Sequence, residues 1–238
     1  MLSASIAAWL GTLAWALIAD MRAMPGVMGM SPATFTAMWT LMMAAMMLPS
    51  VTPFVGVYER TISQDRGARL TGLTFGYLAA WGASGIVAYA IAEAFGALAA
   101  SNNTWTRVVA VGAFAGAGLY QLSPLKMRCL SHCRTPLGHL IHYLGYQGRM
   151  RDVRAGMSHG WFCLGCCWAL MVLMVAFGVM NVPAMVALAG VIGIEKLWKH
   201  GESFAKAVGI AALIFAVALI FFPEFAAGLD PGSMMTMD

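Results

Sequence analysis

Long apolar runs without a charged residue are the feature that most limits what this chain can fold into. Residues 72–92 and 207–222 contain no Asp, Glu, Lys or Arg, and charged residues make up only 10% of the 238 positions. Soluble domains carry about 25% charged residues, and disordered or nucleic-acid-binding chains also need many charges. These classes are therefore excluded. Because the runs are continuous rather than alternating, we expect an all-α polytopic transmembrane helical bundle and not an outer-membrane barrel.

The number of spans follows from the length of the apolar stretches. A transmembrane helix needs about 20 mostly apolar residues, or about 17 at the lower end. Seven stretches meet or approach this length: Leu2–Ala19, Ala33–Leu48 with a continuation through Pro49 and Pro53 to Val57, Gly72–Ala92, Trp105–Leu122, Trp161–Met180, Pro183–Trp198 and Ala207–Phe222. The count falls to six if Leu2–Ala19 or Pro183–Trp198 does not cross. We expect one integral membrane domain over residues 1–238.

The distribution of Lys and Arg predicts the orientation. With seven spans, the loops after the second, fourth and sixth hold three, six and three basic residues, whereas the other loops hold one, one and none. Cytoplasmic loops of membrane proteins carry the excess of Lys and Arg. We therefore predict a bacterial inner (cytoplasmic) membrane protein with a cytoplasmic N-terminus. A long cytoplasmic loop over 123–160 would contain an interfacial helix near 137–146, and a short periplasmic tail would cover 223–238.

The cysteines and several histidines form two clusters. The first cluster contains Cys129, His132 and Cys133, and the second contains His159, Cys163, Cys166 and Cys167. Thiolate and imidazole are the ligands that Cu(I) and Zn(II) prefer. A Cys-x2-Cys pair can bring two sulfurs to one ion, and residues four apart share a helix face. We predict that these seven residues form a metal site on the cytoplasmic side, with Cu(I) favoured and Zn(II) as the alternative.

Other interpretations of the same residues stay open. Buried cysteines often pack as small hydrophobes, and the thiols could also form a regulatory patch. A structural disulfide is not expected because cytoplasmic thiols are kept reduced. No Cys-x-x-Cys-His motif or mid-membrane histidine pair indicates a haem. The neighbouring Glu195 and Lys196 are interpreted as an interfacial ion pair rather than as metal ligands.

Methionine is unusually frequent, with 20 residues. Thioether is a soft, neutral ligand that suits Cu(I), although a methionine stripe in a membrane helix also packs well. Methionines are dense near the predicted outer side, and cysteines lie at the predicted inner side. This order predicts a metal path formed by Met24, Met28, Met30, Met38, Met42, Met46, Met171 and Met174.

Several segments together carry a resemblance to a known family. They are Met42–Ser50 (MMAAMMLPS), Leu122–Lys126 leading into Cys129–Pro136, His159–Trp168 with its Cys-Leu-Gly-Cys-Cys-Trp core, Gly178–Asn181, and Glu195–Lys196. Over about residues 35–200 the chain resembles an uncharacterised bacterial family of predicted metal-binding integral membrane proteins, domain of unknown function 2182. The resemblance implies a multi-pass bundle with a metal site. It implies no settled substrate.

Three functions are compatible with these residues. The first is a soft-metal protein that transports Cu(I) or delivers it to a membrane or periplasmic cuproprotein. The second is a non-catalytic subunit or assembly factor of a membrane complex, in which the thiols pack or regulate. The third is a thiol- or metal-dependent membrane redox enzyme. We assign no catalytic residue, because the sequence offers no general acid or base placed for such turnover.

Overall fold

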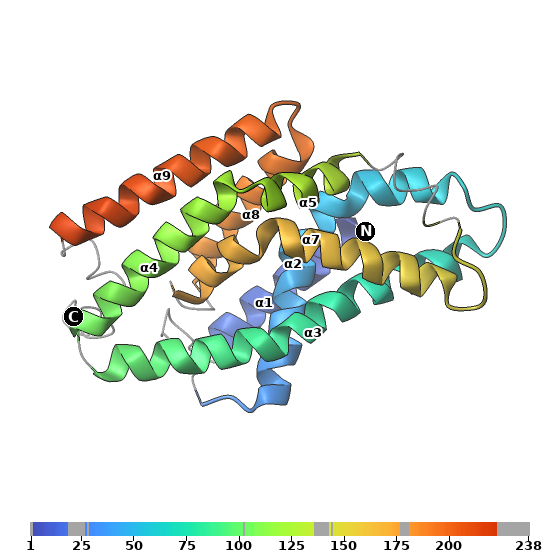
Figure 1. Ribbon diagram of the computed structural model, residues 1–238. Coiled ribbons are helices and arrows are strands. Elements are labelled where there is room, and N and C mark those ends of the chain that lie inside the picture. Colours follow the sequence, from blue (N-terminus) through green and yellow to red (C-terminus); the bar gives the residue numbers. More distant parts are fainter. Residues whose placement is uncertain are drawn as a thin grey trace.

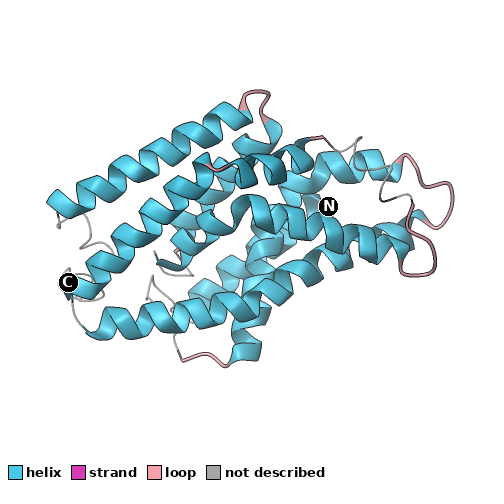
Figure 2. Ribbon diagram, in the orientation of Figure 1, coloured by secondary structure: helices cyan, strands magenta, loops and turns pink. Residues whose placement is uncertain are grey.

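The computed structural model describes residues 2–18, 27, 29–101, 103–135, 143, 145–176 and 181–222. In these ranges the ordered elements are all helices, and no strand occurs (Figure 2). This confirms the all-α prediction. The helices are α1 (Leu2–Ile18), α2 (Pro32–Glu59), α3 (Arg66–Ser101), α4 (Asn103–Leu122), α5 (Pro124–Arg134), α7 (Arg151–Ala176), α8 (Val182–Leu197) and α9 (Gly201–Phe221).

The prediction of seven spans is wrong by helix length and composition. Among the described residues, four helices are long and apolar enough to cross a membrane, in α2, α3, α7 and α9. A fifth span results only if α4 and α5, which are bent by 63° at their junction, count as one. Of the other predicted spans, α1 has 17 residues and α8 has 16. At about 1.5 Å per residue, α8 is only about 24 Å long, less than the hydrocarbon core of about 30 Å.

Helix α2 continues through both of its prolines, as the sequence predicts. Proline lacks an N–H, so Pro49 cannot bond the carbonyl of Ala45, four residues earlier. Ser5 of α1 supplies the missing donor: its hydroxyl donates to the Ala45 carbonyl at 2.9 Å. The bond that the proline removes is thus replaced by one that ties α1 to α2.

Glycines allow α3 and α7 to pack with their backbones close together. A Cβ at Gly76 would overlap the carbonyl of Val153, and one at Gly156 would overlap the carbonyl of Leu73. A Cβ at Gly160 would lie 2.7 Å from that of Ala80. Small residues four apart are the usual means of close helix approach in membranes. This packing fixes α7, and with it the second cysteine cluster, against α3.

The bundle places alternate connections at opposite ends. The loop from α2 to α3 and the loop before α7 lie at the right-hand end of Figure 1, whereas α3 meets α4 at the left-hand end. The right-hand loops and the helix turns beside them contain Arg60, Arg66, Arg69, Arg149, Arg151 and Arg154. Six of the twelve basic residues that the sequence assigns to one side of a membrane therefore lie at this end of the molecule.

Candidate metal site

The second cysteine cluster lies inside α7 rather than at its beginning. Helix α7 begins at Arg151, so Cys163 comes about three turns later. Cys163, Cys166 and Cys167 are each about 1% exposed. The thiols of Cys166 and Cys167 donate to the Cys163 carbonyl at 3.1 and 2.9 Å. The three sulfurs are therefore held in the core by the helix that carries them.

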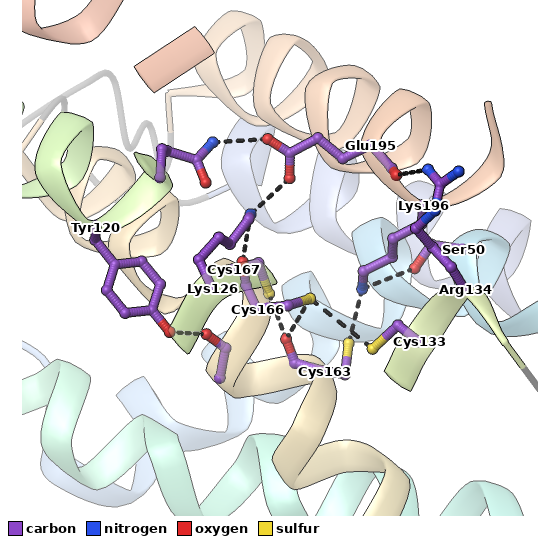
Figure 3. Close-up of polar contacts among 12 residues, drawn as sticks. Ser50, Tyr120, Lys126, Cys133, Arg134, Cys163, Cys166, Cys167, Glu195 and Lys196 are labelled. Atoms are coloured by element: carbon purple, nitrogen blue, oxygen red, sulfur yellow. Dashed lines mark hydrogen bonds and ion pairs between the residues drawn. The ribbon is translucent and has the colours of Figure 1, made fainter. Parts of the chain in front are cut away.

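The first cluster lies on α5, a helix in the stretch for which the sequence predicts a loop. Ser123 caps α5 by accepting a hydrogen bond from the Lys126 N–H at 3.1 Å, and Pro124 occupies its first turn. Proline fits a helix start because its missing N–H would have no partner there. The bend after α4 turns α5 across α7. As a result, Cys133 Sγ lies 3.9 Å from Cys166 Sγ (Figure 3).

Cys129 approaches α7 at a glycine. A Cβ added at Gly165 would lie 3.0 Å from Cys129 Sγ, a tight contact that this sulfur could relieve only by shifting. The carbonyl of Gly165 accepts a hydrogen bond from Tyr120 of α4. Cys129 and Cys133 are both half-buried, in contrast to the three buried cysteines of α7. The α5 thiols therefore form the more accessible side of the sulfur group.

A buried ion pair joins α5 to α8 beside the sulfurs. Lys126 Nζ lies 2.7 Å from Glu195 Oε2, and the two side chains are 0% and 1% exposed. Gln121 donates to the other Glu195 oxygen at 2.6 Å, and Lys126 also donates to the Cys166 carbonyl. At the end of α8, Arg134 donates to the Glu195 carbonyl at 2.7 Å. Buried charges need such partners, and here the partners fix the relative positions of α5, α7 and α8.

Lys196 extends from α8 to the second cluster. Its Nζ lies 2.9 Å from Cys163 Sγ and 3.4 Å from Ser50 Oγ (Figure 3). The Tyr77 hydroxyl lies 2.9 Å from Cys163 Sγ. Lys196 is 8% exposed. An ammonium group this close to a sulfur lowers the electrostatic cost of a negative charge there. The sequence-based pairing of Glu195 with Lys196 is not what the structure shows, because Glu195 bonds Lys126 and Lys196 faces Cys163.

The two predicted histidine ligands belong to an aromatic group beside the sulfurs. His132 Nε2 lies 2.8 Å from the Tyr143 hydroxyl, and its ring stacks on Phe162 with the centroids 3.6 Å apart. The His159 ring stacks on Phe54 at 4.1 Å. The two imidazole centroids lie 6.4 Å apart. Stacked rings of this kind contribute packing energy beyond the area they bury.

A soft metal ion requires sulfur donors that lie close enough together to bind the same ion. In the described part of the chain, no three His, Cys, Asp or Glu side chains form a group that could hold a metal ion. The sulfurs of Cys133 and Cys166 do fit a shared ion. With metal–sulfur bonds of about 2.3 Å, two sulfurs on one ion lie at most about 4.6 Å apart, and these two are 3.9 Å apart. The arrangement therefore suits an ion that accepts two thiolates.

The predicted methionine path is only partly within the described residues. Met24 and Met28 lie outside them, and Met30 is half-buried. Met38, Met42 and Met46 of α2 and Met171 and Met174 of α7 are buried in the core. The described methionines are thus available as packing residues or as internal thioether ligands, and the path itself stays a prediction.

These observations define a class of protein: a chain whose described elements are all helices, several of them of membrane-spanning length, with a group of buried and half-buried thiols that two helices share. The model of the PpoB2 copper chaperone family matches residues 36–219. The match covers most of the chain, which therefore belongs to this copper chaperone family. No curated protein and no solved structure matches it.

The family match bears on the earlier resemblance. It supports a copper-related family. The metal site that the resemblance implied stays a prediction. Membership of domain of unknown function 2182 stays a prediction.

Sequence reasoning missed the lysines of the site. Lys126 and Lys196 are both buried, and each contacts α7 beside a cysteine. A signal was available for Lys196, because an ionisable residue within an apolar helix such as α8 is a functional candidate by default. The partners could not be assigned without the bend between α4 and α5, which turns Lys126 toward Glu195.

Proposed function

We propose that the protein is an integral membrane copper chaperone that holds Cu(I) as cargo between Cys133 and Cys166 and delivers it to a cuproprotein. The observation that carries the proposal is the sulfur pair across α5 and α7, with its separation of 3.9 Å. Family membership supports copper as the metal. No nucleic-acid partner is proposed.

The chemistry of the site favours Cu(I) over Zn(II). Cu(I) is a soft ion that binds thiolates and is stable with two of them, whereas structural Zn(II) sites are almost always four-coordinate. Two thiolates in an apolar core leave Zn(II) short of ligands. They leave Cu(I) with room for one further ligand, which a partner protein can supply, so the ion passes from one protein to the other by ligand exchange.

Access to the site is proposed from the α5 side. Cys133 is half-buried near the end of α5, whereas Cys166 is buried in α7. A partner therefore reaches Cys133 first. Cys129 adds a second half-buried thiol on the same helix, and the methionines of α2 and α7 are proposed to line the internal route. His132 and His159 are proposed to position the helices through their stacked rings rather than to bind copper.

For localisation, we propose the bacterial inner membrane, with the arginine-rich end of the bundle in the cytoplasm. The α2–α3 loop and the segment before α7, which hold six arginines with the helix turns beside them, share one end of the bundle. This supports the orientation, because cytoplasmic loops carry the excess of Lys and Arg. The metal site would then open on the cytoplasmic half of the protein.

Copper binding by purified variants tests the proposal. The full-length protein in detergent micelles should bind about one Cu(I) per chain in competition with a Cu(I) chelator under reducing conditions. Cys133→Ser and Cys166→Ser should each weaken binding by at least about 100-fold, since a hydroxyl is a poor ligand for this soft ion. Bound copper is measured by elemental analysis after gel filtration.

Cys167→Ser is the matched control. Its hydroxyl can still donate to the Cys163 carbonyl that now accepts from the Cys167 thiol, and the site proposed here does not use that sulfur. Copper binding should stay within about threefold of the wild type. Equal losses in all three variants would contradict a two-sulfur site, and copper binding unaffected by Cys133→Ser and Cys166→Ser would overturn the proposed function.

A further inference from the structure

Lys126 and Cys133 of α5 both contact Cys166 of α7. The Lys126 ammonium donates to the Cys166 carbonyl, and Cys133 Sγ lies 3.9 Å from Cys166 Sγ (Figure 3). Lys126 and Cys133 are seven residues apart, which places them about 20° apart around the helix axis. One face of α5 therefore holds the backbone of Cys166 and presents the second thiol to its side chain.

The Lys126 ammonium is itself held in place. It bonds Glu195 Oε2 at 2.7 Å, and Gln121 donates to the other oxygen of that carboxylate. Arg134, the neighbour of Cys133, donates to the Glu195 carbonyl at 2.7 Å. Helix α5 is therefore anchored to the same residue of α8 in its first turn and at its last residue.

Apolar packing alone fixes α5 less strictly. The structure describes all eleven residues of this helix, and the buried ones are Lys126, Leu130 and His132. Leu130 is thus the one buried aliphatic side chain of α5, and the burial of apolar area has no direction. A buried polar or charged residue specifies the register of packed helices, because a shift leaves it without its partner.

We propose that Lys126 is a positioning residue, which sets the register of α5 against α7 so that Cys133 and Cys166 form a two-sulfur site before the metal ion arrives. The inference rests on the proposed function. Two sulfurs on one ion lie at most about 4.6 Å apart, so the observed 3.9 Å leaves about 0.7 Å to spare. A change of register by one residue turns a helix by about 100° and moves it by about 1.5 Å. This would carry Cys133 off the face that meets α7.

The test measures how readily the two sulfurs meet in the full-length protein, in detergent micelles without copper. Cys129, Cys163 and Cys167 are replaced by serine in every sample, so that Cys133 and Cys166 form the only disulfide possible within the chain. Diamide is the oxidant: it takes two electrons and two protons from the thiols as the disulfide forms, and is reduced to the hydrazine. The rate of bond formation, followed by mass spectrometry, reports how well the sulfurs are positioned.

Lys126→Met with Glu195→Gln removes the ion pair without leaving a lone charge in the core. In this double variant the rate of disulfide formation should fall by at least about tenfold, because α5 is free to turn. The affinity for Cu(I), measured with the native cysteines present, should also fall by at least about tenfold, although neither ligand has changed. Lys126→Gln with Glu195→Gln replaces this variant if circular dichroism shows that it has lost its helices.

Tyr58→Phe is the matched control. It breaks a different buried hydrogen bond of α7, from the Tyr58 hydroxyl to Asp152 Oδ1 at 2.5 Å, which involves no residue of α5. Both the rate and the affinity should stay within about threefold of the wild type. An unchanged rate in the double variant, or an equal fall in Tyr58→Phe, would overturn the inference. A rate that depends on Lys126 in a protein that binds no Cu(I) would instead overturn the proposed function and leave the positioning of the two sulfurs in place.

Discussion

At the scale of single residues, two neighbours on α8 have different partners. Glu195 points to Lys126 and Gln121, while Lys196 points to Cys163. Successive residues on a helix are about 100° apart and do not face the same neighbours. The adjacency of a Glu and a Lys in the sequence is therefore poor evidence that they pair. Glu195 stabilises the junction of α4, α5 and α8, whereas Lys196 contacts the sulfur group of α7.

The Lys126–Glu195 pair predicts a specific pattern of stability. Glu195→Gln leaves the buried Lys126 ammonium without a counter-charge, which should lower the free energy of unfolding by about 3–5 kcal/mol. The double variant Lys126→Met with Glu195→Gln removes both charges and should be more stable than the two single losses summed, since no lone charge stays buried. Unfolding in mixed detergent micelles, followed by circular dichroism, measures these differences. Strict additivity of the two losses would contradict a direct pair.

At the scale of helices, the contact between α3 and α7 depends on glycines, which have no side chain to hold the two backbones apart. Gly156→Ala puts a methyl group where the Leu73 carbonyl now lies, and should destabilise the protein by about 1–3 kcal/mol because the helices must move apart. Gly116→Ala in α4 is the matched control. Nothing lies within 4 Å of a Cβ there, so this change should be neutral or stabilise by up to about 1 kcal/mol. Thermal unfolding of both variants in detergent checks the contrast. Equal effects would show that backbone packing does not limit stability at Gly156.

The helices also show which features of the fold can be predicted from the sequence. Apolar runs locate the interiors of α2, α3, α4, α8 and α9, because continuous burial in lipid leaves a strong signal. The ends and crossings are less predictable. Helix α5 is short and polar and matches no hydropathy pattern. Helix α7 contains most of the predicted span Trp161–Met180 but begins earlier, with the charged stretch Arg151–Arg154. The cysteines could be recognised as soft ligands. Their pairing across α5 and α7 could not, because it depends on the bend at Ser123 and Pro124.

At the scale of the whole molecule, the bundle has one basic end and one end with few charges. The α2–α3 loop and the segment before α7 share the basic end, and the α3–α4 connection lies at the other (Figure 1). Helix α3, with 36 residues, is about 54 Å long and exceeds a hydrocarbon core of about 30 Å. In the proposed membrane setting α3 would project from the hydrocarbon core on at least one side, and the arginines of its first turns suit the side where the basic α2–α3 loop lies.

This arrangement predicts which ends of the bundle a membrane-impermeant thiol reagent can reach. Ser63→Cys introduces an exposed thiol in the α2–α3 loop, and Thr104→Cys introduces one at the start of α4, at the opposite end. In intact spheroplasts, Thr104→Cys should be labelled above the wild-type background, whereas Ser63→Cys should be labelled only after lysis, because the proposed orientation places the arginine-rich end in the cytoplasm. The native cysteines give a low background, since three are buried and two are half-buried. Labelling of Ser63→Cys in intact spheroplasts, with Thr104→Cys protected, would invert the protein and turn the α5 side of the site toward periplasmic partners.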